Sequence, residues 1–337
     1  MTRRSLRAPL TDAQLAPLLP QETRVQLSFL PSDAELRRLA AILEPRPDVS
    51  LRVYGNYDRS IHDLEFLRLF PFLRRFAVDS LYDRVTTFDA LRHLPEELEE
   101  LGLGGTKRAL SLEPVGRFRR LLRLYVEGPH RDLQVISRLT ELTDLTLRSV
   151  TLRDLAVLLP LGRLRTLDIK LGGTKDLALL PRIGRLEYLE LWLVRGLSDV
   201  SAVAEMPHLR HLFLQALKHV TTLPSFGGSA ALRRVDLETM RGLTDLAPLA
   251  GAPSLEILNL IEMRHLQAEA MRPFVGHPSL RAGIWDLGSK RRNFAAQDLV
   301  PLPPEPFGYA EARRGEASDR GLAPWRRPEW TGFRSAE

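Results

Sequence analysis

The chain has 337 residues, a formal net charge of +6 at pH 7 and no cysteine. A chain without cysteine has no disulfide bond, no thiolate-bound metal and no cysteine nucleophile. Its hydrophobic (44%) and charged (27%) fractions are typical of a folded globular protein, and no apolar run is long enough to predict a membrane span. Leucine accounts for 66 residues. So high a content usually comes from repetition, which makes length a poor guide to the number of domains.

The first ten residues, MTRRSLRAPL, contain paired arginines like those of a twin-arginine export signal. The next stretch places Asp12 and Gln14 where an export signal has an unbroken apolar core, and no small-residue cleavage site follows. We therefore expect a cytoplasmic location.

Two helices are predicted near the N-terminus from the spacing of their capping residues. Thr11 and Gln14 have the spacing of a capping box and predict a short helix. Ser32 and Glu35 form the same pattern before the sequence LRRLAAIL, and the prolines from Pro45 onward should end that second helix.

A Leu-x-x-Leu-x-Leu pattern recurs along most of the chain, at steps of 21 to 25 residues. Its copies begin at Leu98, Leu121, Leu142, Leu164, Leu186, Leu209, Leu232, Leu255 and Leu280, with looser copies at Leu51 and Leu73. The alternation of leucines predicts a short strand with one apolar face. About 22 residues hold one strand, a turn and a short return limb, so stacked coils should form a parallel sheet on one side of a continuous leucine core.

Acidic residues recur in the return limbs, each followed by an apolar residue. They are Asp132, Asp154, Asp176, Asp199 and Asp245, with Thr222 in the matching place between the last two. A row of carboxylates could indicate a metal or catalytic site, but side chains of this kind also cap short helical or 3₁₀ turns by accepting a backbone N–H. We interpret the row as caps.

These repeats resemble those of the leucine-rich repeat family, and limbs such as TDLAPL at 244–249 are similar to the short, internalin-like bacterial class. The resemblance is close over 73–285 and looser over 22–72. It implies an α/β solenoid, an arc with a concave parallel sheet, short helical or 3₁₀ limbs on the convex side, and protein binding on the concave face. The family usually has an asparagine after each strand, where its side chain bonds the turn. Here that place holds Thr106, Pro129, Val150, Gly172, Val194, Leu217, Met240 and Met263, so the turn must be satisfied in another way.

The chain divides into three parts on this basis. We expect a helical N-terminal cap with the first coil over 1–47, a repeat array over 48–285, and a Pro-, Arg- and Trp-containing segment over 286–337, giving about eleven coils. The last segment has two interpretations. It could cap the open end of the leucine core, which a solenoid needs for solubility, or its LPPEPFGY sequence and tryptophans could dock a second protein.

The third, fifth and seventh residues of each copy should point away from the leucine core and form the binding face. The candidate partner-binding residues are Tyr125, Arg148, Asp168, Lys170, Tyr188, Glu190, Trp192, His211, Phe213 and Asp236. Four of them form a predicted exposed aromatic patch on two adjacent strands: Tyr188, Trp192, His211 and Phe213. Aromatic residues often dominate interface energy. Alternatively, a tail of the same chain could fold over this patch.

Two neighbouring carboxylates, Asp168 and Glu190, are candidates for binding a basic group of a partner, because like charges side by side on a sheet disfavour the fold. Lys170 and Arg148 could instead neutralise them and leave a plain solvated face.

Other motifs do not indicate catalysis. Gly-Gly-Thr-Lys, at 104–107 and 172–175, has the wrong order for a phosphate-binding loop and is interpreted as a turn. His208, His211 and His219 lie before, on and after one predicted strand, which argues against a shared metal. We expect no cofactor, no metal and no enzymatic activity.

The predicted function is therefore a non-enzymatic protein–protein interaction module that acts as a scaffold, adaptor or inhibitor for an unknown protein partner. A specificity or regulatory subunit of an enzyme complex is the alternative. The excess of basic residues raises nucleic-acid binding as a third hypothesis, but the charge is diffuse and forms no basic stripe.

Overall fold

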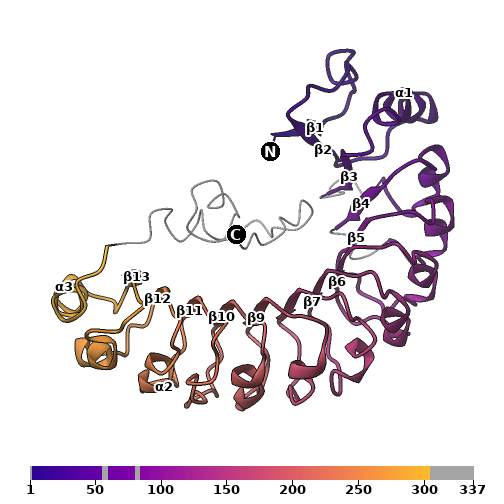
Figure 1. The fold of residues 1–337 in the computed structure, drawn as a ribbon. Helices are drawn as coiled ribbons and strands as arrows, with labels where there is room; N and C mark the ends of the chain where they lie inside the picture. Colours follow the sequence, from indigo (N-terminus) through magenta and orange to yellow (C-terminus); the bar gives the residue numbers. More distant parts are fainter. Residues whose placement is uncertain (1, 55–59, 80–83, 304–337) are drawn as a thin grey trace. The chain divides into compact units, whose positions relative to one another are not determined.

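The computed structural model describes residues 2–54, 60–79 and 84–303. They fall into two compact units, one ending at Val150 and one beginning at Thr151. In each unit, parallel strands follow one another in chain order and return limbs connect them (Figure 1).

The first unit contains seven strands in its described residues. They are β1 (Thr2–Leu6), β2 (Glu22–Leu27), β3 (Ser50–Val53), β4 (Arg75–Val78), β5 (Glu100–Leu103), β6 (Arg123–Glu127) and β7 (Asp144–Arg148). Its limbs contain α1 (Asp33–Leu43) and the 3₁₀ helices η1 (Glu65–Leu69), η2 (Asp89–His93), η3 (Glu113–Arg117) and η4 (Leu133–Arg138).

The second unit continues the same pattern with six described strands. They are β8 (Thr166–Lys170), β9 (Tyr188–Trp192), β10 (His211–Gln215), β11 (Arg234–Glu238), β12 (Ile257–Ile261) and β13 (Ala282–Trp285). Its limbs contain η5 (Ala156–Leu158), η6 (Leu180–Arg182), η7 (Ser201–Glu205), α2 (Ala247–Ala250), η8 (Ala268–Phe274) and α3 (Lys290–Leu299). The predicted parallel sheet with short helical or 3₁₀ limbs is confirmed.

The repeated leucines form the core, as their spacing predicts. Leu189 and Leu191 of β9 lie directly beside Leu212 and Leu214 of β10, and all four are no more than 1% exposed. Each buried leucine contributes about 2 kcal/mol relative to an exposed one, so the stacking of coils is the main source of stability.

Backbone hydrogen bonds satisfy the turns that follow the strands, where leucine-rich repeats usually use an asparagine side chain. Six residues that follow β7 to β12 adopt left-handed conformations with φ between 48° and 59°: Ser149, Leu171, Leu193, Ala216, Thr239 and Glu262. In the second unit the N–H groups of Leu171, Leu193, Ala216 and Thr239 each donate to the last carbonyl of the next strand, at 2.8–2.9 Å. Because the backbone satisfies the turn, the next position is free to hold a buried apolar side chain, such as Val194 or Met240.

Four of the five recurrent aspartates bond limb N–H groups, although they do not occupy the predicted N-cap position. The Oδ1 atoms of Asp154, Asp176, Asp199 and Asp245 each accept from the N–H two residues further on, at 2.8–3.0 Å. Asp154, Asp199 and Asp245 lie one residue before the helix cap position itself. Asp132 differs, because it has a φ of 61° and its carboxylate accepts from the Ser111 hydroxyl.

The N-terminal residues differ from their prediction in one respect and match it in another. No helix forms at Thr11: residues 12–15 make only a turn, in a stretch with prolines at 9, 17 and 20 that interrupt helical hydrogen bonding. The second helix is confirmed as α1, with the full capping box of Ser32 and Glu35. Strand β1 was not predicted, whereas β2 lies in the stretch from residue 22 that resembles the repeat loosely.

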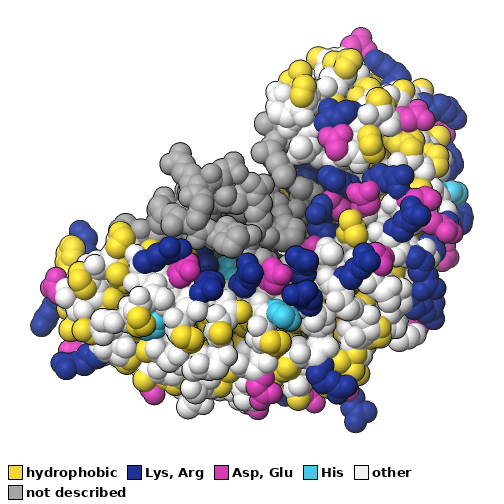
Figure 2. All heavy atoms as spheres, in the orientation of Figure 1, with side chains coloured by type: hydrophobic (Ala, Val, Ile, Leu, Met, Phe, Trp, Pro, Cys, Tyr) yellow, Lys and Arg dark blue, Asp and Glu magenta, His cyan; other side chains and the backbone are white. Residues whose placement is uncertain are grey.

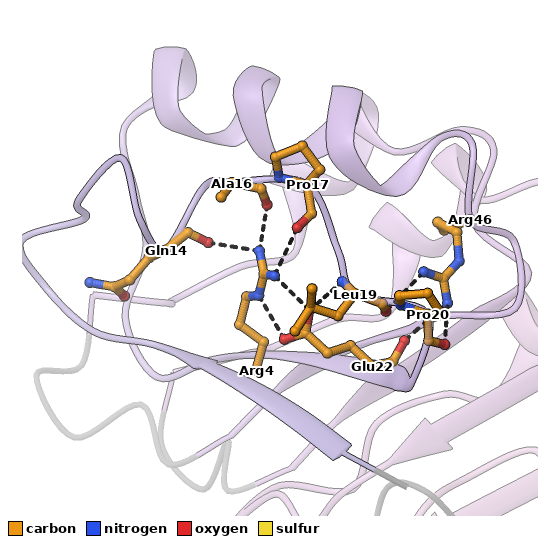
Figure 3. Close-up of polar contacts among 8 residues, drawn as sticks. All are labelled: Arg4, Gln14, Ala16, Pro17, Leu19, Pro20, Glu22 and Arg46. Carbon is orange, nitrogen blue, oxygen red and sulfur yellow. Dashed lines mark hydrogen bonds and ion pairs between the residues drawn. The ribbon is translucent and has the colours of Figure 1, made fainter.

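An arginine network ties the N-terminal loop to these strands (Figure 3). Arg4 binds both carboxylate oxygens of Glu22, at 2.9 and 2.6 Å, and donates to the carbonyls of Gln14, Ala16 and Pro17. The Arg4 side chain also lowers the pKa of Glu22. Arg46 holds the other side of the loop through the carbonyls of Leu19, Pro20 and Glu22.

At the other end, α3 follows the last strand. Ser289 caps it by accepting from the Arg292 N–H, and Arg292 donates to the carbonyls of Arg264 and Leu266 in the preceding coil. The described chain then returns to β13, where the Gly283 N–H donates to the Pro303 carbonyl at 3.2 Å. Most of the predicted cap or tail, from residue 304 to 337, lies outside the described residues. No helix among the described residues is long and apolar enough to cross a membrane.

Candidate partner-binding surface

The strand register places the predicted outward residues in three lateral rows on β8 to β12. The rows are Thr166, Tyr188, His211, Arg234 and Ile257; Asp168, Glu190, Phe213, Asp236 and Asn259; and Lys170, Trp192, Gln215, Glu238 and Ile261. We call these fifteen side chains the strand face. The assignment of rows from sequence is confirmed, and eight of the ten predicted site residues belong to the strand face.

One cluster on the strand face joins two carboxylates to a single ammonium. The Lys170 Nζ lies 3.2 Å from Asp168 Oδ2 and 3.0 Å from Glu190 Oε2. The Tyr188 hydroxyl also donates to Glu190 Oε2, at 3.0 Å. Both carboxylates are fully buried. Lys170 is thus one cation shared by two anions, as one of the two sequence interpretations anticipated.

A second cluster surrounds Asp236. Its Oδ2 lies 2.6 Å from His211 Nε2 and 2.9 Å from Arg234 Nε, and its Oδ1 accepts from Asn259 Nδ2 at 2.7 Å. Burial acts to raise the pKa of Asp236, but Arg234 and then His211 outweigh it and hold that pKa well below its usual range. The His211 ring also packs edge-on against Tyr188, with centroids 4.8 Å apart.

Arg234 and Asn259 were not among the predicted site residues. Both occupy outward rows, Arg234 two residues before Asp236 on β11 and Asn259 beside it on β12. The row pattern alone could have found them, since a polar residue next to a buried carboxylate is its natural partner.

The remaining two predicted residues lie in the first unit and are joined through Glu127. The Tyr125 hydroxyl donates to Glu127 Oε2 at 2.8 Å, and Arg148 Nε lies 3.3 Å from Glu127 Oε1. Burial, together with Glu127, raises the pKa of Tyr125. Arg148 therefore pairs within its own unit.

The predicted exposure of the aromatic patch is wrong for two of its rings. Tyr188 and Phe213 are each 2% exposed, and Trp192 and His211 are half-buried. The physical reason is that outward direction on a strand fixes only which face a side chain occupies, whereas exposure depends on what else covers that face.

The strand face carries more negative than positive charge. It holds four carboxylates, of Asp168, Glu190, Asp236 and Glu238, against the two basic groups of Lys170 and Arg234. On the described part of the surface seen in Figure 2, basic and acidic side chains are interspersed along the second unit and no continuous basic stripe appears.

The other motifs singled out in the sequence form no site. Both Gly-Gly-Thr-Lys segments follow strands, β5 and β8, as irregular loops. Within the residues that the structure describes, no three His, Asp or Glu side chains are arranged to hold a metal ion.

Comparison with known proteins bears on the fold. No sequence profile of a protein family and no curated protein matches the chain. Among solved structures, an internalin, InlF, of Listeria monocytogenes matches over 88% of this chain and 89% of its own, with 18% identity and a TM-score of 0.55. An internalin C2 of the same species matches over 64% of this chain and 81% of its own, with 19% identity and a TM-score of 0.39. The parallel strands with short limbs and the likeness to InlF together show that the chain has the leucine-rich repeat fold.

Proposed function

We propose that the chain is a protein-binding module whose strand face takes a partner segment with basic and aromatic side chains. The observation that carries the proposal is the pair of outward-facing carboxylates on adjacent strands, Asp168 and Glu190, both of which lie within 3.2 Å of the Lys170 ammonium.

A guanidinium suits this cluster better than an ammonium, because its planar fork can bond two carboxylates at once. Trp192 lies beside Lys170 in the seventh-position row, where a partner's aromatic or aliphatic side chain could pack on it. Aromatic anchors next to charged pairs are typical of residues that dominate interface energy.

The same charges favour a protein partner over nucleic acid. A face with four carboxylates against two basic groups repels phosphates, whereas nucleic-acid binding depends on neutralising them. We also propose that the strand face binds its partner without catalysing a reaction. The lowered pKa of Asp236 makes that carboxylate a poor proton acceptor near neutral pH.

We retain a cytoplasmic site of action as part of the proposal. Detection of the protein in the cytosolic fraction of its native host tests this. Recovery from the surface or medium would contradict it.

The test of binding removes charge without changing shape. Candidate partners captured from the native host are purified, and their affinity is measured by isothermal titration calorimetry against wild type and an Asp168→Asn, Glu190→Gln double variant. We expect at least tenfold weaker binding, about 1.4 kcal/mol. Truncation of Phe213 would be a poorer test, since a ring that is 2% exposed can also affect folding.

The matched control carries the same change of charge elsewhere. Glu205 and Asp298 are exposed and lie on limbs of the second unit, so a Glu205→Gln, Asp298→Asn variant should bind like wild type. Equal affinities for all three proteins would contradict the proposed function. Circular dichroism and thermal unfolding establish that each variant is folded.

A further inference from the structure

A row of exposed cations follows the strands of the second unit, at the edge of the sheet where the strands end. We call it the cation row, and its members are Lys175, Arg195, Lys218, Arg241 and Arg264. The last four each stand three residues after one member of a lateral row of the strand face: Trp192, Gln215, Glu238 and Ile261. These four cations are 23 residues apart in the sequence, so only the stacking of coils brings them together.

Neighbouring turns pack closely along this row. A Cβ atom on Gly196 would lie 2.8 Å from Lys175 Cε and 3.1 Å from its Nζ, so the Lys175 ammonium rests against the residue next to Arg195. A Cβ atom on Gly242 would lie 2.7 Å from the Lys218 carbonyl oxygen. Glycine at both places lets one turn approach the next, and successive turns are therefore about 4.8 Å apart, as the strands are.

The cation row is poorly compensated by acidic groups of the described chain. Arg264 Nη2 lies 3.6 Å from Glu262 Oε1, whereas the other four cations make no ion pair with a described residue. The remaining acidic residues of these turns each accept a limb N–H through Oδ1: Asp176, Asp199 and Asp245. Their carboxylates are therefore directed toward the limbs and not toward the cations.

The opposite edge of the same strands compensates its charges. There Arg165 Nη1 lies 3.5 Å from Glu187 Oε1, and Arg233 Nε lies 3.8 Å from Glu256 Oε1. Like charges side by side on neighbouring strands disfavour the fold, and the alternation of arginine with glutamate relieves this cost. The cation row keeps the repulsion without such relief. An anionic ligand that bridges neighbouring cations would remove it.

We infer that the cation row binds an extended acidic peptide segment, laid across the turns that follow β8 to β12. Four intervals of about 4.8 Å make the row about 19 Å long, which about six extended residues span. Exposed hydroxyl groups stand three residues after three of the cations and can donate to the same carboxylates: Ser198, Thr221 and Thr244. This surface lies beside the strand face, and its existence does not rest on the function proposed for that face.

A peptide fits the row better than a nucleic acid does. Proteins that bind single-stranded nucleic acids combine basic groups with aromatic side chains on which the bases stack. The turns that carry the cation row contain no phenylalanine, tyrosine or tryptophan. Their most exposed large apolar side chain is Leu193, at 42%, which suits contact with an aliphatic side chain of a peptide.

Binding of a defined acidic peptide to the full-length chain tests the inference. The probe is a fluorescein-labelled peptide of about twelve residues in which glutamate alternates with serine, because alternation places the carboxylates on one side of an extended backbone. Fluorescence anisotropy measures its dissociation constant. We expect an Arg195→Gln, Lys218→Gln, Arg241→Gln variant to bind at least tenfold more weakly than wild type. The wild-type affinity should fall as salt is added, and a peptide with glutamine in place of glutamate should not bind.

The matched control removes three cations elsewhere on the second unit. An Arg182→Gln, Arg185→Gln, Arg272→Gln variant has the same net charge as the cation-row variant, and all three positions are exposed. It should bind the acidic peptide like wild type. Circular dichroism and thermal unfolding establish that both variants are folded. Equal weakening in the two variants would show that the peptide responds only to overall charge, and the inference would fail.

Two further outcomes would overturn the inference. One is the absence of measurable peptide binding to wild type at low salt. The other is tighter binding of a thymidine oligonucleotide of equal charge, lost in the cation-row variant, which would make the row a nucleic-acid site.

A variant of the strand face separates this inference from the proposed function. Asp168→Asn, Glu190→Gln should bind the acidic peptide at least as tightly as wild type, because it changes no member of the cation row. Loss of peptide binding in this variant would place the peptide on the strand face and contradict the inference. Peptide binding that depends on the cation row would support the inference even if the strand face proved to bind no partner.

Discussion

Two buried aspartates, each held by an arginine, differ in the direction in which their pKa values move. Asp236, with Arg234, His211 and Asn259 around it, has a lowered pKa. Asp79 follows β4, and its Oδ1 accepts from Arg52 Nε at 3.2 Å. Burial raises the pKa of Asp79 to about 6, although Arg52 opposes this. Burial raises the pKa of each carboxyl group, and cationic and hydrogen-bonding partners lower it, so the number of such partners decides the direction of the shift.

Removing the charge of Asp236 should destabilise the protein at neutral pH. We expect Asp236→Asn to lower the free energy of unfolding by about 3 kcal/mol at pH 7, because it breaks a buried charged network. The folded-state pKa lies below the unfolded value, so the stabilisation is present above about pH 4 and is lost as the pH falls further. Urea unfolding at pH 7 and 3.5 should show the gap between variant and wild type narrowing. A constant gap would contradict the assignment.

The opposite sign is expected for Asp79. Its folded-state pKa of about 6 lies above the usual value of 3.8, so the folded state holds a proton that the unfolded state has lost between these pH values. Wild type should therefore lose up to about 3 kcal/mol between pH 4 and 7 through this group. Asp79→Asn should flatten this part of the pH profile. The measurement is the slope of unfolding free energy against pH, and an unchanged slope would refute the prediction.

Several strands of this fold end in turns in which a non-glycine residue takes a left-handed conformation. Ala216 has a φ of 54°, and its N–H donates to the Glu238 carbonyl at 2.9 Å. A left-handed L-residue costs about 1–2 kcal/mol, which glycine avoids, although glycine also loses more entropy on folding. The repeat accepts this local cost because the hydrogen bond links consecutive strands.

Ala216→Gly should therefore stabilise the protein, by about 0.5 kcal/mol after the entropy difference. The measurement is the midpoint of chemical denaturation at constant slope. Ala230→Gly is the matched control at an exposed position without positive φ, and it should be neutral or destabilising. Loss of stability in Ala216→Gly would mean that the left-handed turn is not strained.

The elements could be predicted where leucine spacing is regular and not where other residues replace it. The copies from Leu98 to Leu280 predicted every strand from β5 to β13 at the right register. Strand β2 carries the same alternation in Val25 and Leu27, but the copy is incomplete. Strand β1 has no repeated leucine pattern at all, and only its pairing with β2 defines it.

At the scale of the whole chain, most contacts join neighbouring coils, so stability should be local. We expect Arg4→Ala to speed hydrogen exchange of β1 and β2 amides by about two orders of magnitude, since it removes five bonds that hold the loop over 14–22. The β11 and β12 amides should exchange as in wild type. Mass spectrometry of peptide fragments measures both.

Arg3→Ala is the control for this prediction, because Arg3 is exposed on the same strand. It should leave exchange unchanged throughout. Faster exchange in β11 after the Arg4 change would mean that the coils unfold as one cooperative block.

The site could be predicted from sequence only in part. Strand alternation places Tyr188, Glu190 and Trp192 on one face because a strand repeats every two residues. The burial of Tyr188 and Glu190 could not be predicted, since alternation fixes only the face that a side chain occupies. The partners of Asp236 could be found only once the lateral rows were known.

The backbone bonding of the turns after β8 to β11 has a consequence for the growth of such a chain. Since no particular side chain completes the turn, a whole period, such as the 23 residues from Leu209 to Ala231, could be duplicated or excised without breaking the hydrogen bonds on either side. Each lateral row would then gain or lose one side chain per coil while each retained coil kept its geometry.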